Sequence, residues 1–206
     1  TGSTNDFASS LKLPLDVLEA TKNIIEGQPV PYDAGRFGGR VFSYVASFGA
    51  FTRTSYTTPQ SIKNALGHTA YVLEGIQELT QIRNEHIKMI VDGEVVEDDF
   101  LFGAICNSTS VGGVLTLDPD VVDLQDNKLE ILLVRAPRNL AELHECILAL
   151  QDQTYNCAML TFRSATHIRI FADPEMPWTL DGEREEGHSE VEVVPEHLAY
   201  RLMKRV

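Results

Sequence analysis

The chain has 206 residues and a formal net charge of -13, and 43% of its residues are hydrophobic and 23% are charged. These values are typical of an ordinary soluble globular protein. A surface this acidic repels phosphate backbones, which argues against nucleic acid as a partner and against polybasic docking on anionic lipid. The sequence contains no run of eighteen apolar residues and therefore predicts no transmembrane helix.

The three cysteines, Cys106, Cys146 and Cys157, are odd in number and form no C-x-x-C pair. They predict neither a disulfide framework nor a zinc site, and small buried thiols of this kind are typical of a reducing cytoplasm. The first four residues include no start methionine and no signal-like segment. We interpret them as the middle of a longer protein.

Up to residue 48 the pattern predicts two short helices followed by a hairpin of two strands, at residues 5–11, 15–25, 29–37 and 40–48. Thr4 or Asn5 is placed to cap the first helix, and Gly27 to end the second. The longest helical pattern follows at residues 59–82, weakened by two glycines.

The rest of the chain predicts short strands, at residues 86–91, 95–97, 100–106, 129–134, 157–163, 167–171, 178–180 and 191–194. One further helix is expected at residues 139–150. Pro195 is expected to stop the last strand, and residues 196–203 are predicted as a terminal helix. The fold class is therefore α+β, a mainly antiparallel β-sandwich or barrel-like sheet with inserted helices.

The first motif with chemical meaning is Gly2-Ser3-Thr4-Asn5-Asp6-Phe7-Ala8. Glycine allows a backbone to approach a ligand closely, and hydroxyls donate hydrogen bonds to phosphate. Asn5 and Asp6 either cap the helix or turn outward to bind ribose or metal. On chemistry alone an ordinary capped loop is the simpler interpretation.

The triplet Asp-Gly-Glu occurs twice, at residues 92–94 and 181–183. In both places it is typical of a type I′ hairpin turn, because Asp-Gly supplies two residues with positive φ. A separate acidic loop, residues 118–127, could hold a hard cation such as Mg²⁺ through oxygen ligands, with Asp123 and Asp126 as candidates. A solvated loop explains these carboxylates equally well.

The first motif resembles the G-[T/S]-x-N-D-F-A signature of the diacylglycerol kinase catalytic family, which includes bacterial soluble lipid kinases and sphingosine and ceramide kinases. Further resemblances follow in family order along nearly the whole chain, at residues 33–35, 42–49, 63–71, 107–119 and 178–183. Each resemblance is weak alone, but together they are specific. In the acidic loop the family pattern ends D-D-G, whereas this chain has Gln125-Asp126-Asn127.

The resemblance implies an α/β domain that grips the nucleotide through a G-G-D-G-T loop, and a β-sandwich domain that completes the active site. No G-G-D-G-T occurs in these 206 residues. We therefore expect residues 1–30 to be a remnant of the nucleotide-binding domain and residues 31–195 to be the β-sandwich. Residues 196–206 are expected to form a carboxyl-terminal segment returning to the first domain.

By the same resemblance, Gly2, Ser3, Asn5 and Asp6 are expected to contact ATP. Asp181 is expected to be the general base that accepts the proton of a lipid hydroxyl, with Glu183 as the second choice. The implied activity is phosphoryl transfer from ATP to a lipid, with Mg²⁺ as cofactor and diacylglycerol as the leading substrate. The implied location is the cytoplasm, with transient association with the membrane surface.

Two other classes stay open, together with homodimerisation. One is a non-catalytic β-sandwich that binds lipid or dimerises, which gains weight if Asp181 faces away from the cleft. The other is a kinase of the nicotinamide dinucleotide type, which shares the two-domain plan. The Asn-Asp-Phe-Ala segment and the late Asp-Gly-Glu favour the lipid branch.

Overall fold

The computed structural model of the chain describes residues 5–49, 84–111, 115–117, 120–152 and 154–205. Within these ranges eleven strands form one sheet, and β6 and β7 form a separate small hairpin. The strands are β1 Gln28–Phe37, β2 Arg40–Phe42, β3 Val45–Gly49, β4 Glu85–Val91, β5 Glu94–Cys106, β6 Ser110–Val111, β7 Leu115–Thr116, β8 Leu129–Arg135, β9 Leu160–Ala165, β10 Ile168–Phe171, β11 Trp178–Leu180, β12 Glu183–Glu185 and β13 Glu190–Lys204. The helices are α1 Asp6–Ser10, α2 Val17–Glu26 and α5 Leu140–Gln151.

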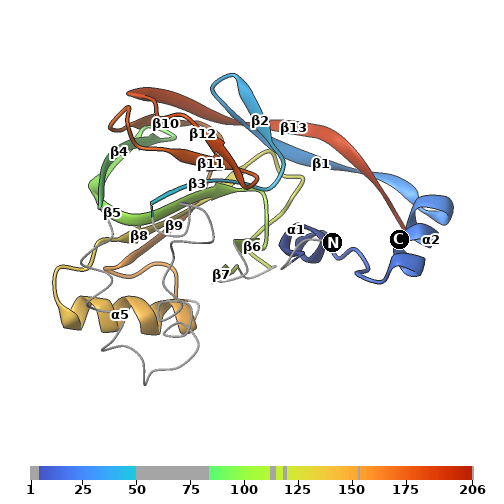
Figure 1. The fold of residues 1–206 in the computed structure, drawn as a ribbon, viewed down its shortest axis with the longest axis horizontal. Helices are drawn as coiled ribbons and strands as arrows, with labels where there is room; N and C mark the ends of the chain where they lie inside the picture. The colour runs from blue at the N-terminus through green and yellow to red at the C-terminus, as the bar shows by residue number, and fades with distance from the viewer. Residues whose placement is uncertain (1–4, 50–83, 112–114, 118–119, 153, 206) are drawn as a thin grey trace.

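The large sheet is antiparallel and curls until its two edges approach each other (Figure 1). Its strand order is β12-β11-β3-β5-β4-β10-β13-β1-β2, with β8 and β9 branching from β5. The edge strands β2 and β12 are joined by an ion pair between Arg40 and Glu185. Beside this pair the ring of Phe37 lies 4.8 Å from that of Trp178, centroid to centroid. Side chains therefore close the sheet at this seam.

Hydrophobic side chains pack on both faces of the central strands. The cluster inside the curl is rich in aromatic rings: Phe37, Phe42, Phe48, Phe100 and Trp178. The outer cluster joins Leu132 of β8 to Cys146 of α5, which covers that face of the sheet. Because β8 contributes to both clusters, its near-continuous apolar sequence is that of a strand buried on two sides. The predicted fold class is confirmed.

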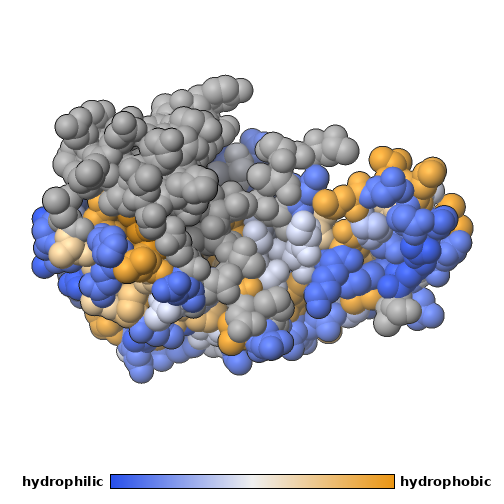
Figure 2. Space-filling model, turned by 90° about the horizontal axis from the view of Figure 1, so that it is seen from below, coloured by the Kyte–Doolittle hydropathy of each residue, from blue (hydrophilic) through white to orange (hydrophobic). Residues whose placement is uncertain are grey.

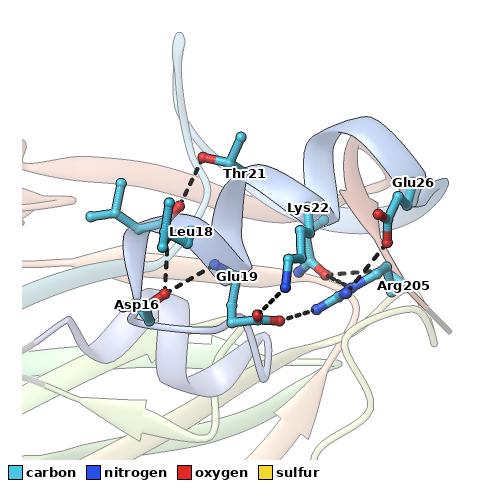
Figure 3. A network of polar contacts seen from close by, with 9 residues as sticks. Asp16, Leu18, Glu19, Thr21, Lys22, Glu26 and Arg205 are labelled. Atoms are coloured by element: carbon cyan, nitrogen blue, oxygen red, sulfur yellow. Dashed lines mark hydrogen bonds and ion pairs between the residues drawn. The ribbon is translucent and has the colours of Figure 1, made fainter.

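Strands β1 and β13 pair with each other and form an arm that extends from the curled sheet to α2 (Figure 1). At the end of this arm Arg205 binds the polar side of α2. Its guanidinium donates to Glu19 at 2.6 Å and to Glu26 at 3.4 Å (Figure 3). It also donates to Asn23 at 3.2 Å. Asp16 caps the helix by accepting two backbone N–H groups.

Helix α2 consequently turns its apolar side outward. Its large side chains are exposed by 66–76%: Val17, Leu18, Ile24 and Ile25. These positions fall at i, i+1, i+7 and i+8, so they form one stripe along the helix. Hydrophobic surface gathers at this end of the molecule in Figure 2. Such a stripe normally faces a partner, whereas here Asn23 is the buried residue of the helix.

The segment 196–203 is a strand, so the prediction of a terminal helix is wrong. β13 continues through Pro195 to Lys204 and is paired with β1. Beyond Val193 its described pairing is with β1 alone, which leaves one side of the strand open and tolerates a proline. A register shift opposite Asp33 accommodates Leu198, whose φ is 49°. Pairing with β1 outweighs the local helical spacing.

Three further expectations differ in detail. The predicted strand 40–48 is interrupted at residues 43–44, where β2 ends and β3 has yet to begin. Residues 95–97 and 100–106 belong to one long strand, β5. Asn5 stands at the start of α1 with φ 54° and its side chain makes no capping bond. The predicted helix 59–82 lies outside the described residues.

Candidate active site

The second Asp-Gly-Glu triplet forms the turn between β11 and β12. Asp181 and Gly182 have φ values of 50° and 89°, which is the type I′ pattern predicted from the sequence. The backbone N–H of Asp181 donates to the carbonyl of Val45 at 2.8 Å. The turn thereby lies against the start of β3, next to the seam of the sheet.

The carboxylate of Asp181 accepts four hydrogen bonds from residues 43–45, which lead from the end of β2 into the start of β3. Ser43 donates its backbone N–H at 2.7 Å and its hydroxyl at 3.2 Å to one oxygen. The N–H groups of Tyr44 and Val45 donate to the other oxygen, both at 2.9 Å. An ionised carboxylate has about four acceptor positions, so those of Asp181 are filled. This side chain holds the turn to the sheet.

Glu183, two residues further on, is in a different situation. It is exposed, and within the described part of the chain its carboxylate has no hydrogen-bonding or ionic partner. It pairs across the hairpin with Leu180, so its position is fixed by the strand and its acceptor oxygens remain open. The turn therefore combines one carboxylate that is fully bound with one that is accessible.

The first triplet reproduces this geometry at the turn between β4 and β5. Asp92 and Gly93 have φ values of 47° and 91°. The carboxylate of Asp92 accepts the N–H and hydroxyl of Thr166 and the N–H of His167, at 2.9–3.2 Å. Its own N–H donates to the carbonyl of His167 at 2.9 Å. The turn predicted here is confirmed.

Helix α1 lies against the segment that Asp181 holds. The ring of Phe7 is 5.8 Å from that of Tyr44 and 6.5 Å from that of Tyr200, which in turn stacks on Tyr32 at 5.8 Å. The hydroxyl of Tyr200 is buried and has no hydrogen-bond partner among the described residues. Burial raises the pKa of Tyr200 to about 12, with the neighbouring Tyr32 and Asp181 among the lesser causes.

The sequence placed four nucleotide contacts at the start of the chain. Gly2 and Ser3 lie outside the described residues. Asn5 immediately precedes α1, and Asp6 is its first residue, so both lie one turn or less from Phe7. Helix α1 thus brings this part of the motif close to Tyr44 and, through it, to the Asp-Gly-Glu turn. Their contact with ATP stays a prediction.

The acidic loop is organised by local hydrogen bonds. Asp123 accepts the N–H of Gln125, and Asp126 accepts the N–H of Lys128, both at 3.0 Å. Both carboxylates line a groove of about 670 Å³ between this loop, the end of α1 and the arm. In the described ranges no three His, Cys, Asp or Glu side chains are grouped as metal ligands would be. The metal assignment of Asp123 and Asp126 stays a prediction.

Asp33 is a structural centre; the sequence analysis placed it in a family-like segment, residues 33–35, but gave it no role. Its side chain is fully buried and accepts bonds from His197 at 2.9 Å, from Leu198 N–H at 2.7 Å and from Asn127 N–H at 2.6 Å. It thereby ties the acidic loop to the bulge in the arm. An aspartate in the middle of a predicted strand was the available signal, because a buried carboxylate needs several donors.

The curled antiparallel sheet and its covering helix define a β-sandwich-like domain, with the Asp-Gly-Glu turn exposed beside its seam. Residues 45–201 match the family described as the YegS C-terminal NAD kinase beta sandwich-like domain. That match covers more than half of the chain, and the chain belongs to this family. Among the described helices, none is long and apolar enough to cross a bilayer.

Curated relatives and solved structures agree with this family. The chain is 30% identical over 184 residues to a diacylglycerol kinase of Bacillus subtilis strain 168, covering 88% of this chain and 60% of that protein. It is 33% identical over 183 residues to a diacylglycerol kinase of Staphylococcus carnosus strain TM300, covering 88% and 59%. The chain thus spans about three fifths of the length of these relatives.

The fold is similar to that of a crystal structure of a diacylglycerol kinase from Bacillus anthracis strain Sterne. The TM-score is 0.69 at 19% identity, over 100% of this chain and 65% of that one. An NAD kinase from Archaeoglobus fulgidus in complex with ATP gives 0.50 at 10% identity, over 91% and 60%. At these identities the likeness concerns the fold alone.

Proposed function

We propose that the chain is the carboxyl-terminal part of an ATP-dependent lipid kinase, with diacylglycerol as the leading substrate and phosphatidic acid as the product. The observation that carries this proposal is the accessible carboxylate of Glu183. It lies in a turn that Asp181 holds to the backbone of Tyr44, whose ring contacts Phe7 of α1. The names of the bacterial relatives support the substrate class.

The two carboxylates of the turn receive different roles. The acceptor positions of Asp181 are filled, so we assign it to positioning, whereas Glu183 has open oxygens and accepts the proton. The lipid hydroxyl oxygen attacks the γ-phosphorus and forms the new O–P bond. The bond from that phosphorus to the bridging oxygen breaks, ADP leaves with the electron pair, and the hydroxyl proton passes to Glu183.

This assignment reverses the order that the sequence suggested, where Asp181 was the first choice. Glu183→Gln is expected to lower kcat about 10²- to 10⁴-fold while leaving the folding stability unchanged. Asp181→Asn is expected to lower both activity and stability, because an amide NH₂ would face the backbone donors of residues 43–45. If Glu183→Gln remains active and Asp181→Asn folds normally without activity, Asp181 is the base.

We propose that the triphosphate binds as its Mg²⁺ complex, so that the cation enters with the nucleotide. In the part of the chain that the structure describes, no three His, Cys, Asp or Glu side chains are grouped as ligands of a separate metal ion. We propose that Asn5 and Asp6, with Gly2 and Ser3, contact the nucleotide beside α1. Catalysis then depends on positioning the two substrates across the short distance from α1 to the turn.

We also propose the two-domain division expected from the sequence, with residues 1–30 belonging to the nucleotide-binding domain, residues 31–195 to the β-sandwich and the end of the chain returning to the first domain. The outward apolar stripe of α2 supports this, because a helix of that kind covers an apolar partner in an α/β domain. Arg205 joins the end of the chain to the same helix.

The proposal is tested with full-length protein by following transfer of radiolabelled phosphate from ATP to diacylglycerol presented in vesicles. Lipid-dependent turnover that Glu183→Gln removes is the expected result. Because electrostatic attraction to anionic lipid is weak for so acidic a chain, we expect activity to persist on neutral vesicles, with transient binding of this cytoplasmic protein to the surface. Transfer to NAD in place of lipid would establish the alternative suggested by the fold neighbour.

A further inference from the structure

Helix α1 is too short to hold its own position. It has five residues and no side-chain cap, whereas isolated helices need roughly 12–15 residues to persist in water. Contacts with the β domain must therefore fix it. Two are described: the ring of Phe7 among Tyr44 and Tyr200, and the hydroxyl of Ser10, which lies 2.6 Å from that of Ser108.

The first of these contacts leads directly to the Asp-Gly-Glu turn. Tyr44 presents its ring to Phe7 and its backbone N–H to the carboxylate of Asp181. Tyr200 also contacts Phe7, and the charge of Asp181 is one of the lesser causes that raise the pKa of this tyrosine. Tyr44 thus joins α1 to the turn, and Tyr200 packs on the same ring of Phe7. A shift of Phe7 would therefore displace residues 43–45, which donate all four hydrogen bonds to Asp181.

We infer that Phe7 is a positioning residue: through Tyr44 it sets the Asp-Gly-Glu turn, with Asp181 and Glu183, at a fixed place relative to α1, and the ring of Tyr200 holds Phe7 from another side. The consequence of this inference rests on the proposed function: binding of the nucleotide beside α1 affects the position of the Asp-Gly-Glu turn. The geometry itself stands without that function. Aromatic pairs prefer defined separations and tilts, so a ring at position 7 transmits position better than an aliphatic side chain of similar volume.

The chain offers a matched control for this inference. Asp92 sits in an equivalent turn and accepts equivalent bonds, but from Thr166 and His167, which belong to the approach to β10. Neither of these residues contacts Phe7 among the described interactions. If the coupling is specific, Phe7 influences Asp181 and leaves Asp92 unaffected.

The first experiment is a double-mutant cycle on the unfolding equilibrium of this chain in urea. Phe7→Leu combined with Asp181→Asn is expected to depart by about fivefold from the product of the two single effects on the unfolding constant. Phe7→Leu combined with Asp92→Asn is expected to be multiplicative. Phe7→Tyr, which keeps the ring, is expected to behave as the wild type in both cycles. Multiplicative behaviour at Asp181, or equal departures in both cycles, would overturn the inference.

The second experiment reads the turn directly and does not depend on stability. In ¹H–¹⁵N spectra Phe7→Leu is expected to move the amide signals of Gly182 and Glu183 and to leave those of Gly93 and Glu94 in place. Unchanged amide signals of Gly182 and Glu183 would overturn the inference. Neither experiment requires catalysis, so an absence of lipid phosphorylation in the full-length protein would refute the proposed function while these outcomes kept their meaning.

Discussion

Asp92 and Asp181 occupy the same position in two hairpins and hold the same kind of partner. Each is the first central residue of a type I′ turn, donates its N–H to a carbonyl at or just before the start of a neighbouring antiparallel strand, and accepts the N–H groups that lead into that strand. Each turn therefore pins the entry of a third strand. The repeated Asp-Gly-Glu triplet reflects a shared structural requirement. The second copy differs in its surroundings, because its turn is held to Tyr44, which contacts α1.

Alanine at either aspartate is expected to destabilise the fold to a similar extent. Except for the partly buried N–H of Val45, the N–H groups released by Asp92→Ala or Asp181→Ala are exposed enough to bind water, so the cost resembles that of losing a helix cap, about 1–2 kcal/mol each. For a chain of this size we expect each melting temperature to fall by about 2–8 °C. Thermal unfolding measures it. A stability loss confined to one variant would contradict the structural equivalence.

The pairing of these turns shows what the sequence could predict. Asp-Gly between alternating segments specifies a turn locally, so both turns were predictable. The recipient segments, residues 43–45 and 166–167, are more than 70 residues away along the chain, and no local pattern connects them to their aspartates. Likewise Glu196 to Met203 has helical spacing, and only its partner β1 makes it a strand. Long-range pairing decided these features.

The same distinction applies to the candidate site. Asp181, Glu183 and the start of α1 were named from motifs, but the order of the two carboxylates could not be. It depends on which of them meets Ser43, Tyr44 and Val45 in space. Tyr200 had no signal at all, since a tyrosine in a strand is ordinary until its buried hydroxyl is seen to lack a partner.

Glu130 is expected to make the stability of the chain depend on pH. It is buried in β8, and burial, helped by the charge of Asp126, raises its pKa to about 8. In the unfolded chain the pKa returns to near its ordinary value of 4.5. Between these values the folded state binds the extra proton, so the free energy of unfolding falls as the pH rises from about 4.5 to 8.

Glu130→Gln removes this titration while keeping the shape of the side chain. The wild type is expected to lose about 4 kcal/mol more than the variant between pH 5 and pH 8.5. Urea unfolding at a series of pH values measures the difference between the two proteins, in which histidine contributions cancel. Parallel pH profiles would show that Glu130 ionises in the folded state as it does in water.

The exposed stripe of α2 is expected to bind apolar probes without stabilising this chain. Leu18→Gln with Ile25→Gln should reduce binding of a hydrophobic dye and any self-association, while changing the free energy of unfolding by no more than about 0.5 kcal/mol per site. Dye fluorescence and sedimentation measure the two effects. As the matched control on the opposite side, Asn23→Ala should destabilise, because it removes the acceptor of Arg205. A large decrease in the free energy of unfolding of the glutamine variant would mean that other residues of this chain already cover the stripe.

The acidic loop is expected to bind divalent cations weakly or not at all. Asp123 and Asp126 are engaged with N–H groups of their own loop, and Gln125 and Asn127 stand where the related pattern has a carboxylate and a glycine. Calorimetric titration with Mg²⁺ and with Ca²⁺ tests this. Submillimolar binding that Asp126→Ala abolishes would establish a metal site in this loop.

Finally, these 206 residues are expected to fold and yet not to catalyse. Folding is supported by the two hydrophobic clusters, which bury residues on both faces of the central strands. We expect a cooperative thermal melt. The ring contacts of Phe7 should keep α1 in place, so that the side of the site formed by this chain is present.

Catalysis has a further requirement that this sequence does not meet. A triphosphate is held by backbone N–H groups and basic side chains, and the glycine-rich loop that would supply them by resemblance does not occur in the chain. Without bound geometry, an accessible Glu183 cannot recover the roughly 7–11 kcal/mol that positioning can contribute. We expect no ATP binding by calorimetry up to millimolar nucleotide and no transfer of radiolabelled phosphate to lipid. Micromolar ATP affinity, or turnover that Glu183→Gln removes, would place the nucleotide site within these residues.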